Sequence, residues 1–248
     1  DLHSFPTRRS SDLGNSPKVD IRTPQMSVAS IPIQTIKKLP VLVGEVDIIK
    51  SLQQLPGVSN AGEASSGFNV RGGAADQNLI MLDQATIFNA SHLFGFLSIY
   101  NADAIRDMKL YKGGMPARYG GRISSVLDVY QKDGNNTQFH ATGGIGVLSS
   151  RLLAEGPIVK DKSSFLIGGR ASYAHLFLKL TDNNNSAYFY DLNTKLNTKI
   201  DDQNSLYLSG YFGRDVFDLS QTISNSYGNT LVNLRITKIG RASCRERV

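Results

Sequence analysis

A series of segments that alternate apolar and polar residues, over residues 137–239, constrains the fold of this chain more than any other feature. Alternation with a period of two is typical of β-strands whose two faces have different surroundings. The clearest segment is YFYDLNTKLNTKI (188–200), whose apolar face carries Tyr188, Tyr190, Leu192, Leu196 and Ile200 and whose polar face carries Asp191, Asn193, Lys195, Asn197 and Lys199. We expect six antiparallel strands, at about 138–147, 150–158, 163–178, 188–200, 205–216 and 229–239.

The connectors between these segments help to distinguish two kinds of β-protein. Short turns at 159–162 and 201–204 alternate with longer polar loops at 180–187 and 218–229. An outer-membrane β-barrel has this rhythm, together with aromatic girdles and a polar lumen face. The pattern therefore favours a transmembrane barrel. A soluble β-sandwich also alternates, so it stays open as the alternative.

The N-terminal half has a different texture. Residues 14–43 are polar and contain four prolines, which predicts an extended segment. Residues 44–56 have the pattern of a short helix. We expect a small mixed α/β domain at 44–134, dense in glycine-rich turns. Its expected strands are 68–72, 79–82, 108–111 and 125–130, and its expected helical turns are 91–97 and 101–106.

Both ends of the chain depart from these patterns. DLHSFPTRRSSDL (1–13) and GRASCRERV (240–248) resemble translated sequencing-adapter read-through, and we expect them to be non-native tails. The alternative is that they are ordinary disordered tails. Without them the net charge falls from +6 to +4, because the first tail contributes nothing and the second contributes +2. The single cysteine, Cys244, lies in the second tail, so neither a disulfide nor thiol chemistry is expected. No apolar run reaches about 18 residues, so no transmembrane helix is expected, and any export signal is expected outside this chain.

Four motifs resemble the plug domain of TonB-dependent outer-membrane receptors, in the form common in Bacteroidetes-type bacteria. They are GEVDIIKSLQQLPGVSN (44–60), GFNVRGGAADQNLIMLD (67–83), FNASHLFGF (88–96) and YKGGMPARYGGRISSVLDVYQKDG (111–134). LLAEGPIVKDKSSF (152–165) resembles the first hairpin of the attached barrel. The resemblance spans about residues 25–239. It departs at Gln84, where the family usually has glycine after the aspartate of an LDG turn.

This resemblance implies a plug domain folded inside a barrel of about 22 strands, of which this chain carries the first six. The chain is thus expected to be a fragment of an outer-membrane receptor of a Gram-negative bacterium. Such a receptor takes up a ligand too large for porins, with energy delivered by the periplasmic protein TonB. The ligand class stays open among iron chelates, cobalamin, glycans and peptides. The other expected partner is outer-membrane lipid, and a lipoprotein lid also stays open.

The alternative to this reading is a soluble or surface-exposed β-rich protein, with an adhesive or structural role and no transport activity. Catalysis is not expected, because the glycines of 113–121 lead into a strand rather than a helix and no GK[ST] motif follows them. No two histidines lie at metal-ligand spacing, so neither a metal nor a cofactor is predicted. Basic residues are dispersed rather than interleaved with aromatic ones, which argues against binding of nucleic acid.

The arginines and glycines of these motifs predict how the plug domain is attached to the barrel. Arg71, Arg118 and Arg122 carry guanidinium groups suited to bidentate pairing with carboxylates of the barrel, so they are candidate latches. The alternative is that they bind plug carbonyl groups, or Asp83 and Asp128 within the plug. Glycines permit tight turns and close backbone packing. The candidate turn glycines are Gly72, Gly73, Gly113, Gly114, Gly120 and Gly121.

The resemblance also implies which turns face a ligand: Ser59–Ser66, Ala74–Gln77 and Phe88–Phe96. The candidate ligand contacts on these turns are Glu63, Asp76, Gln77, Asn89 and His92. The alternative is that each is an ordinary solvated loop residue. An energy-coupling segment is expected within 21–30, without assigned residues.

Overall fold

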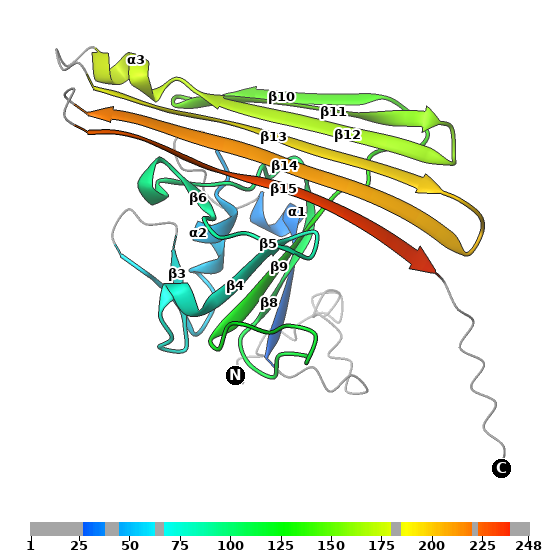
Figure 1. The fold of residues 1–248 in the computed structure, drawn as a ribbon, viewed down its shortest axis with the longest axis horizontal. Helices are drawn as coiled ribbons and strands as arrows, with labels where there is room; N and C mark the ends of the chain where they lie inside the picture. The colour runs from blue at the N-terminus through cyan, green and yellow to red at the C-terminus, as the bar shows by residue number, and fades with distance from the viewer. Residues whose placement is uncertain (1–26, 38–44, 63–66, 180–184, 220–222, 239–248) are drawn as a thin grey trace, which may run out of the picture.

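Two β-sheets dominate the structure, a computed structural model that describes residues 27–37, 45–62, 67–179, 185–219 and 223–238. A five-stranded sheet has the order β1-β8-β9-β4-β5, and a six-stranded sheet runs from β10 to β15 in sequence order. We call the six-stranded sheet the wall and residues 27–131 the plug unit. The plug unit lies against one face of the wall (Figure 1). Both predicted tails and most of the predicted extended segment lie outside the described residues.

The wall confirms the prediction of six antiparallel strands, each paired with the next. They are β10 (His140–Ile145), β11 (Ser149–Val159), β12 (Ser163–Ser172), β13 (Ser186–Lys199), β14 (Asn204–Leu219) and β15 (Ile223–Lys238). The predicted strand 163–178 is too long, because it ends at Ser172 and α3 (Ala174–Lys179) follows. The Ser172 hydroxyl accepts a hydrogen bond from the Ala174 amide, the first amide of α3. Conversely, β15 begins earlier than predicted, because its pairing with β14 continues to Ile223.

The two faces of the wall differ as the alternation predicts. Asp191, Asn193 and Lys195 are at most 4% exposed and face the plug unit. The opposite face leaves apolar side chains exposed, among them Ile145, Leu152, Ile167, Leu192, Leu196, Leu208, Val232, Leu234 and Ile236. No helix in the described part of the chain is long and apolar enough to cross a membrane.

The plug unit is a mixed α/β unit, as predicted, and among its described strands only β4 and β9 pair in parallel. Its elements are β1 (Val28–Pro32), α1 (Ile33–Ile36), α2 (Ile48–Leu52), β2 (Val58–Asn60), β3 (Phe68–Val70), η2 (Ala75–Gln77), β4 (Asn78–Leu82), β5 (Ala85–Thr86), β6 (Ser91–His92), η3 (Leu93–Gly95), β7 (Leu97–Ser98), β8 (Ile105–Tyr111) and β9 (Ser125–Gln131).

Several boundaries in the plug unit differ from the predicted ones. The predicted helix 44–56 shortens to α2, because the Asp47 side chain accepts the Lys50 amide and caps the helix there. The predicted helical turn 91–97 is instead a β6–β7 hairpin around η3, since Leu93 and Phe94 have φ of 52° and 56°. The predicted turn 101–106 is shorter, because β8 starts within it.

The described part of the predicted extended segment is an edge strand followed by one helical turn. β1 pairs with β8 at the border of the five-stranded sheet, where Pro32 is tolerated because an edge strand has one unpaired side. Ile33 and Ile36 of α1 are buried in the core. The N-terminal segment is therefore integrated into the plug unit at Val28.

One apolar core joins the plug unit to the wall. It is built mainly from α1, α2 and the five-stranded sheet, with Ile48, Leu52 and Leu127 fully buried. Tyr211 and Leu231, from β14 and β15, belong to the same cluster. The plug unit and the wall are therefore packed together as well as hydrogen-bonded.

The structure requires glycine at some of the predicted turn positions and not at others. Gly72, Gly113, Gly114 and Gly121 have positive φ, whereas Gly120 does not and has open space around it. Gly73 packs on Ser124 within the plug unit, not on the wall. Gly134, in the connection to β10 and outside the predicted set, packs against the wall. Its φ is +79°, and a Cβ there would lie 2.5 Å from the carbonyl oxygen of Phe165.

We therefore expect Gly134→Ala to destabilise the protein by about 1–3 kcal/mol, because backbone strain adds to a clash with main-chain atoms. The matched control Gly120→Ala should stay within about 0.5 kcal/mol of the parent. Denaturant unfolding of the detergent-solubilised protein measures both. Equal unfolding free energies for the two variants would contradict this account of the connection.

Candidate functional site: the contact between plug unit and wall

The contact between the plug unit and the wall is organised around buried charges. Arg170 on β12 is 5% exposed. Its guanidinium donates to Oδ2 of the neighbouring Asp191 from Nε (2.8 Å) and Nη2 (2.5 Å). It also crosses to the plug unit, where Nη2 donates to the Ser98 carbonyl (3.0 Å) and Nη1 to Glu45 Oε2 (3.3 Å). Glu45 in turn accepts from the Ser149 hydroxyl on β11. Arg170 thus binds the plug unit while its charge is neutralised within the wall.

His92 forms the second part of this contact. Its Nδ1 lies 2.8 Å from Asp215 Oδ2 and its Nε2 lies 3.2 Å from Asp191 Oδ2. The ring stacks on Phe189 with centroids 4.2 Å apart, and the Tyr211 hydroxyl lies 3.2 Å from Nε2. Imidazole can donate to both carboxylates only when both nitrogens carry a proton. Burial lowers the pKa of His92, but the hydrogen bonds to the two aspartates outweigh it and raise the pKa above its usual value of 6.5.

Lys195 on β13 forms the third part. Its Nζ is 2.9 Å from Asp133 Oδ1, 3.0 Å from the Gln131 carbonyl and 3.3 Å from Asp83 Oδ1. Asp83 and Gln84 have φ of 48° and 72°, so the turn keeps its left-handed shape although glycine is absent at residue 84. One wall cation therefore joins the β4–β5 turn of the plug unit to the end of β9 and to Asp133, which follows it.

The three predicted latch arginines lie elsewhere. Arg71 donates to the Ser27 hydroxyl (2.8 Å), Arg118 to the hydroxyl of Tyr119 (3.0 Å) and Arg122 to the Gly121 carbonyl (2.9 Å). Among the described residues, none of the three forms an ion pair. The β8–β9 loop that carries Arg118 and Arg122 lies at the end of the plug unit away from the wall (Figure 1). No contact with β10–β15 therefore supports them as latches, and their pairing with other barrel strands stays a prediction.

The predicted ligand-facing residues fall in three kinds of surroundings. Asp76 is exposed, Gln77 and Asn89 are half-buried and cap their own turns, and Glu63 lies outside the described residues. His92 is only 1% exposed. The structure corrects both expectations for His92, because wall carboxylates hold it inside and it is neither a solvated loop residue nor open to a ligand.

Sequence reasoning missed Arg170, Glu45 and the pairing role of Lys195. A signal for the wall cations existed, because both lie on the polar face of an alternating strand. The sequence does not predict which residues pair with these cations, because the partners are distant along the chain: Arg170 and Glu45 are 125 residues apart. Within the described residues, no cluster of three or more histidine, cysteine, aspartate or glutamate side chains could hold a metal ion.

We expect Lys195→Met to destabilise the docked plug unit by about 3–5 kcal/mol, because it leaves Asp83 buried with an unpaired charge. Lys199→Met is the matched control, since Lys199 is exposed near the end of the same strand. Denaturant unfolding gives both values. A Lys195 variant as stable as the Lys199 variant would show that this buried pair contributes nothing.

The raised pKa of His92 predicts a dependence of docking on pH. A group whose pKa is raised by folding stabilises fully below its unfolded pKa, and this stability is lost as pH rises through the folded pKa. We therefore expect docking to be most stable below the usual imidazole pKa of 6.5 and to weaken as the pH rises from there through the raised pKa of folded His92. His92→Gln should remove this step, whereas His140→Gln, on exposed β10, should keep it. Thermal unfolding across pH measures the step, and an unchanged step in His92→Gln would contradict the assignment.

Comparison with known proteins agrees with this architecture. Residues 20–126 match the family model of the TonB-dependent Receptor Plug Domain. No curated protein sequence matches the chain. The siderophore receptor PirA from Acinetobacter baumannii is 20% identical, with a TM-score of 0.57 over 79% of this chain and 32% of that chain.

Two further solved structures share the fold. The outer membrane transporter YddB from Escherichia coli is 12% identical, with a TM-score of 0.58 over 85% of this chain and 36% of that chain. The P. aeruginosa protein FpvA, bound to heterologous pyoverdines, is 13% identical, with a TM-score of 0.57 over 86% of this chain and 32% of that chain. The chain spans about a third of the length of these structures. Residues 20–126 are thus similar to the TonB-dependent receptor plug domain, and the plug unit and wall together share the fold of these solved structures.

Proposed function

We propose that this chain is part of a Gram-negative outer-membrane receptor that imports a ligand too large for porins, with energy supplied through TonB. The observation that carries this proposal is the contrast between the two faces of the wall. One face is polar, charged and covered by the plug unit, and the other is apolar and exposed. A plug inside a membrane barrel needs this arrangement, because lipid surrounds the barrel and the plug fills its lumen.

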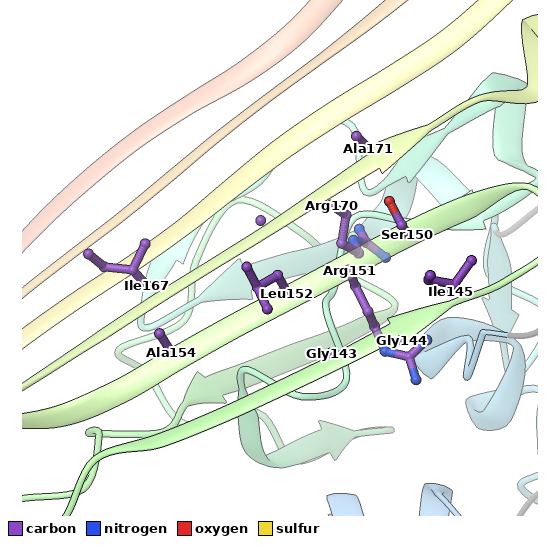
Figure 2. Close-up of a pocket in the computed structure, with 11 residues that line it drawn as sticks. Gly143, Gly144, Ile145, Ser150, Arg151, Leu152, Ala154, Ile167, Arg170 and Ala171 are labelled. Carbon is purple, nitrogen blue, oxygen red and sulfur yellow. The ribbon is translucent and has the colours of Figure 1, made fainter.

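The exposed face has the chemistry of a lipid contact. Contiguous exposed apolar surface of this kind marks an interaction with another apolar phase. Figure 2 shows part of it on β10–β12, where Leu152 and Ile167 line an open hollow of about 910 Å³. Gly143 and Gly169 leave this space because they lack side chains. We assign the hollow to acyl chains of the outer membrane rather than to the transported ligand.

The polar contact supports a plug that is held and can be remodelled. Ion pairs and hydrogen bonds at the plug–wall contact can be exchanged for bonds to water when the plug moves, whereas a dry apolar contact would lose its whole stabilisation. We extend the proposal to Arg71, Arg118 and Arg122, as latches to barrel strands other than β10–β15. PirA is a siderophore receptor and FpvA binds pyoverdines. An iron chelate is therefore one candidate ligand, beside cobalamin, glycans and peptides.

Single-tryptophan variants test the membrane assignment, since the chain has no natural tryptophan. Leu208 lies on the exposed face of β14, and Tyr207 beside it faces Lys195 and Arg235 on the plug side. In the full-length receptor, with any tryptophan outside this chain replaced by phenylalanine and the protein reconstituted with brominated lipid, we expect Leu208→Trp fluorescence to be quenched and Tyr207→Trp fluorescence to be retained. Stable monomeric protein without detergent, with no quenching at either position, would favour the soluble β-rich alternative.

A further inference from the structure

Asp103 connects three parts of the fold through one carboxylate. It lies just before β8 and is 7% exposed. Lys37, immediately after α1, places its Nζ 2.6 Å from Asp103 Oδ1. Arg151, on wall strand β11, places its Nε 2.8 Å from Asp103 Oδ2. The N-terminal segment and the wall, which are distant in sequence, thus hold opposite oxygens of the same side chain.

Asp103 is held in its ionised form. Burial raises the pKa of Asp103, but hydrogen bonds to Lys37 and Arg151 outweigh it and lower the pKa below the usual value. The backbone of Asp103 is held as well, because its amide donates to Asn101 Oδ1 at 3.0 Å. A buried carboxylate of this kind is stable with two cations and is less stable when one is withdrawn.

The segment that carries Lys37 is placed so that it can leave the plug unit. Among the described strands, β1 pairs with β8 alone, at the edge of the five-stranded sheet and over the five residues Val28–Pro32. Removing it would leave the other four strands paired. α1 would leave with it, and Lys37 with α1. Because this segment is the first described part of the chain, a pull on the preceding residues reaches β1 and α1 before any other element.

A polar hollow of about 240 Å³ lies where these parts meet. It is lined by Lys37, Glu45, Val46, Asn101, Ala102, Asp103, Arg151 and Arg170. The lining therefore includes the N-terminal segment on one side and two wall arginines on the other. Withdrawal of Lys37 would widen the hollow along β11 and β12 while the wall side stays in place.

We propose that Asp103 is a positioning residue for energy coupling, which transmits the state of the β1–α1 segment to wall strand β11. With Lys37 in place the carboxylate holds two cations and the hollow is closed on that side. With Lys37 withdrawn the carboxylate holds Arg151 alone, and the plug–wall contact loosens beside β11. This inference rests on the proposed function, since it assigns the site at which a pull from TonB first alters the plug–wall contact.

Hydrogen exchange of the peptide covering 28–37 tests this coupling in the full-length receptor in detergent. Arg151 lies on the wall, yet we expect Arg151→Met to speed exchange of this peptide by roughly threefold or more, because contacting charges are energetically coupled. Lys37→Met should have a similar effect, and the double variant should add little to it. Lys160→Met, exposed at the β11–β12 turn at the other end of β11, is the control and should leave the peptide unchanged.

Unchanged exchange in Arg151→Met, or fully additive effects in the double variant, would overturn the proposal. If Arg151→Met fails to assemble, Arg151→Lys against Arg151→Gln asks the same question, with slower exchange expected in the lysine variant. Equal exchange in those two variants would also overturn it. The measurement needs neither ligand nor TonB, so its failure leaves the transport proposal standing. Conversely, the receptor could show the expected exchange effects but no TonB-dependent uptake. That result would contradict the transport proposal and would leave the link between Arg151 and the 28–37 peptide established.

Discussion

The burial of cations in the wall is the constraint on which the rest of the structure depends. Arg170 and Lys195 lie on strands whose inward face is covered, and a buried charge is stable only with paired counter-charges. Asp191 supplies one counter-charge within the wall. Glu45 and Asp83 come from two separate parts of the plug unit. The plug unit must therefore fold with these loops in register with the wall, which ties its internal fold to its docking.

The same chemistry explains how one contact can be both specific and reversible. Apolar packing between the two parts includes Tyr211 and Leu231 in the main core, and Leu153 and Leu166 against Ala104. The contact also contains hydrogen bonds and ion pairs, which fix orientation and whose loss water can compensate. The exposed apolar side chains of the wall lie on its opposite face, which a membrane would cover under the proposed function. One face of these strands thus binds the plug unit, and under the proposed function the opposite face of the same strands contacts lipid.

The strand pattern could be predicted from sequence because period-two alternation is a local signal that each strand carries by itself. For that reason the sequence predicts that Asp191 and Lys195 share the polar face of their strand. Their partners were not, because the pairing of Arg170 with Glu45 depends on how separate elements pack. His92 is the clearest case that local sequence does not predict. Its loop has the composition of an exposed turn, but the His92 ring is buried and lies within hydrogen-bond distance of two wall aspartates. Likewise, nothing local predicts that β1 joins β8.

Docking of the plug unit on the polar face of the wall can be measured by site-specific photo-crosslinking in the full-length receptor. The hydroxyl of Tyr227, on β15, lies 3.4 Å from the Phe94 amide, and Phe212 points to the opposite face. A benzophenone amino acid at 227 should crosslink to plug residues 88–98, and at 212 it should crosslink to lipid. A folded, membrane-inserted receptor that gives no crosslink from 227 to the plug would contradict the account.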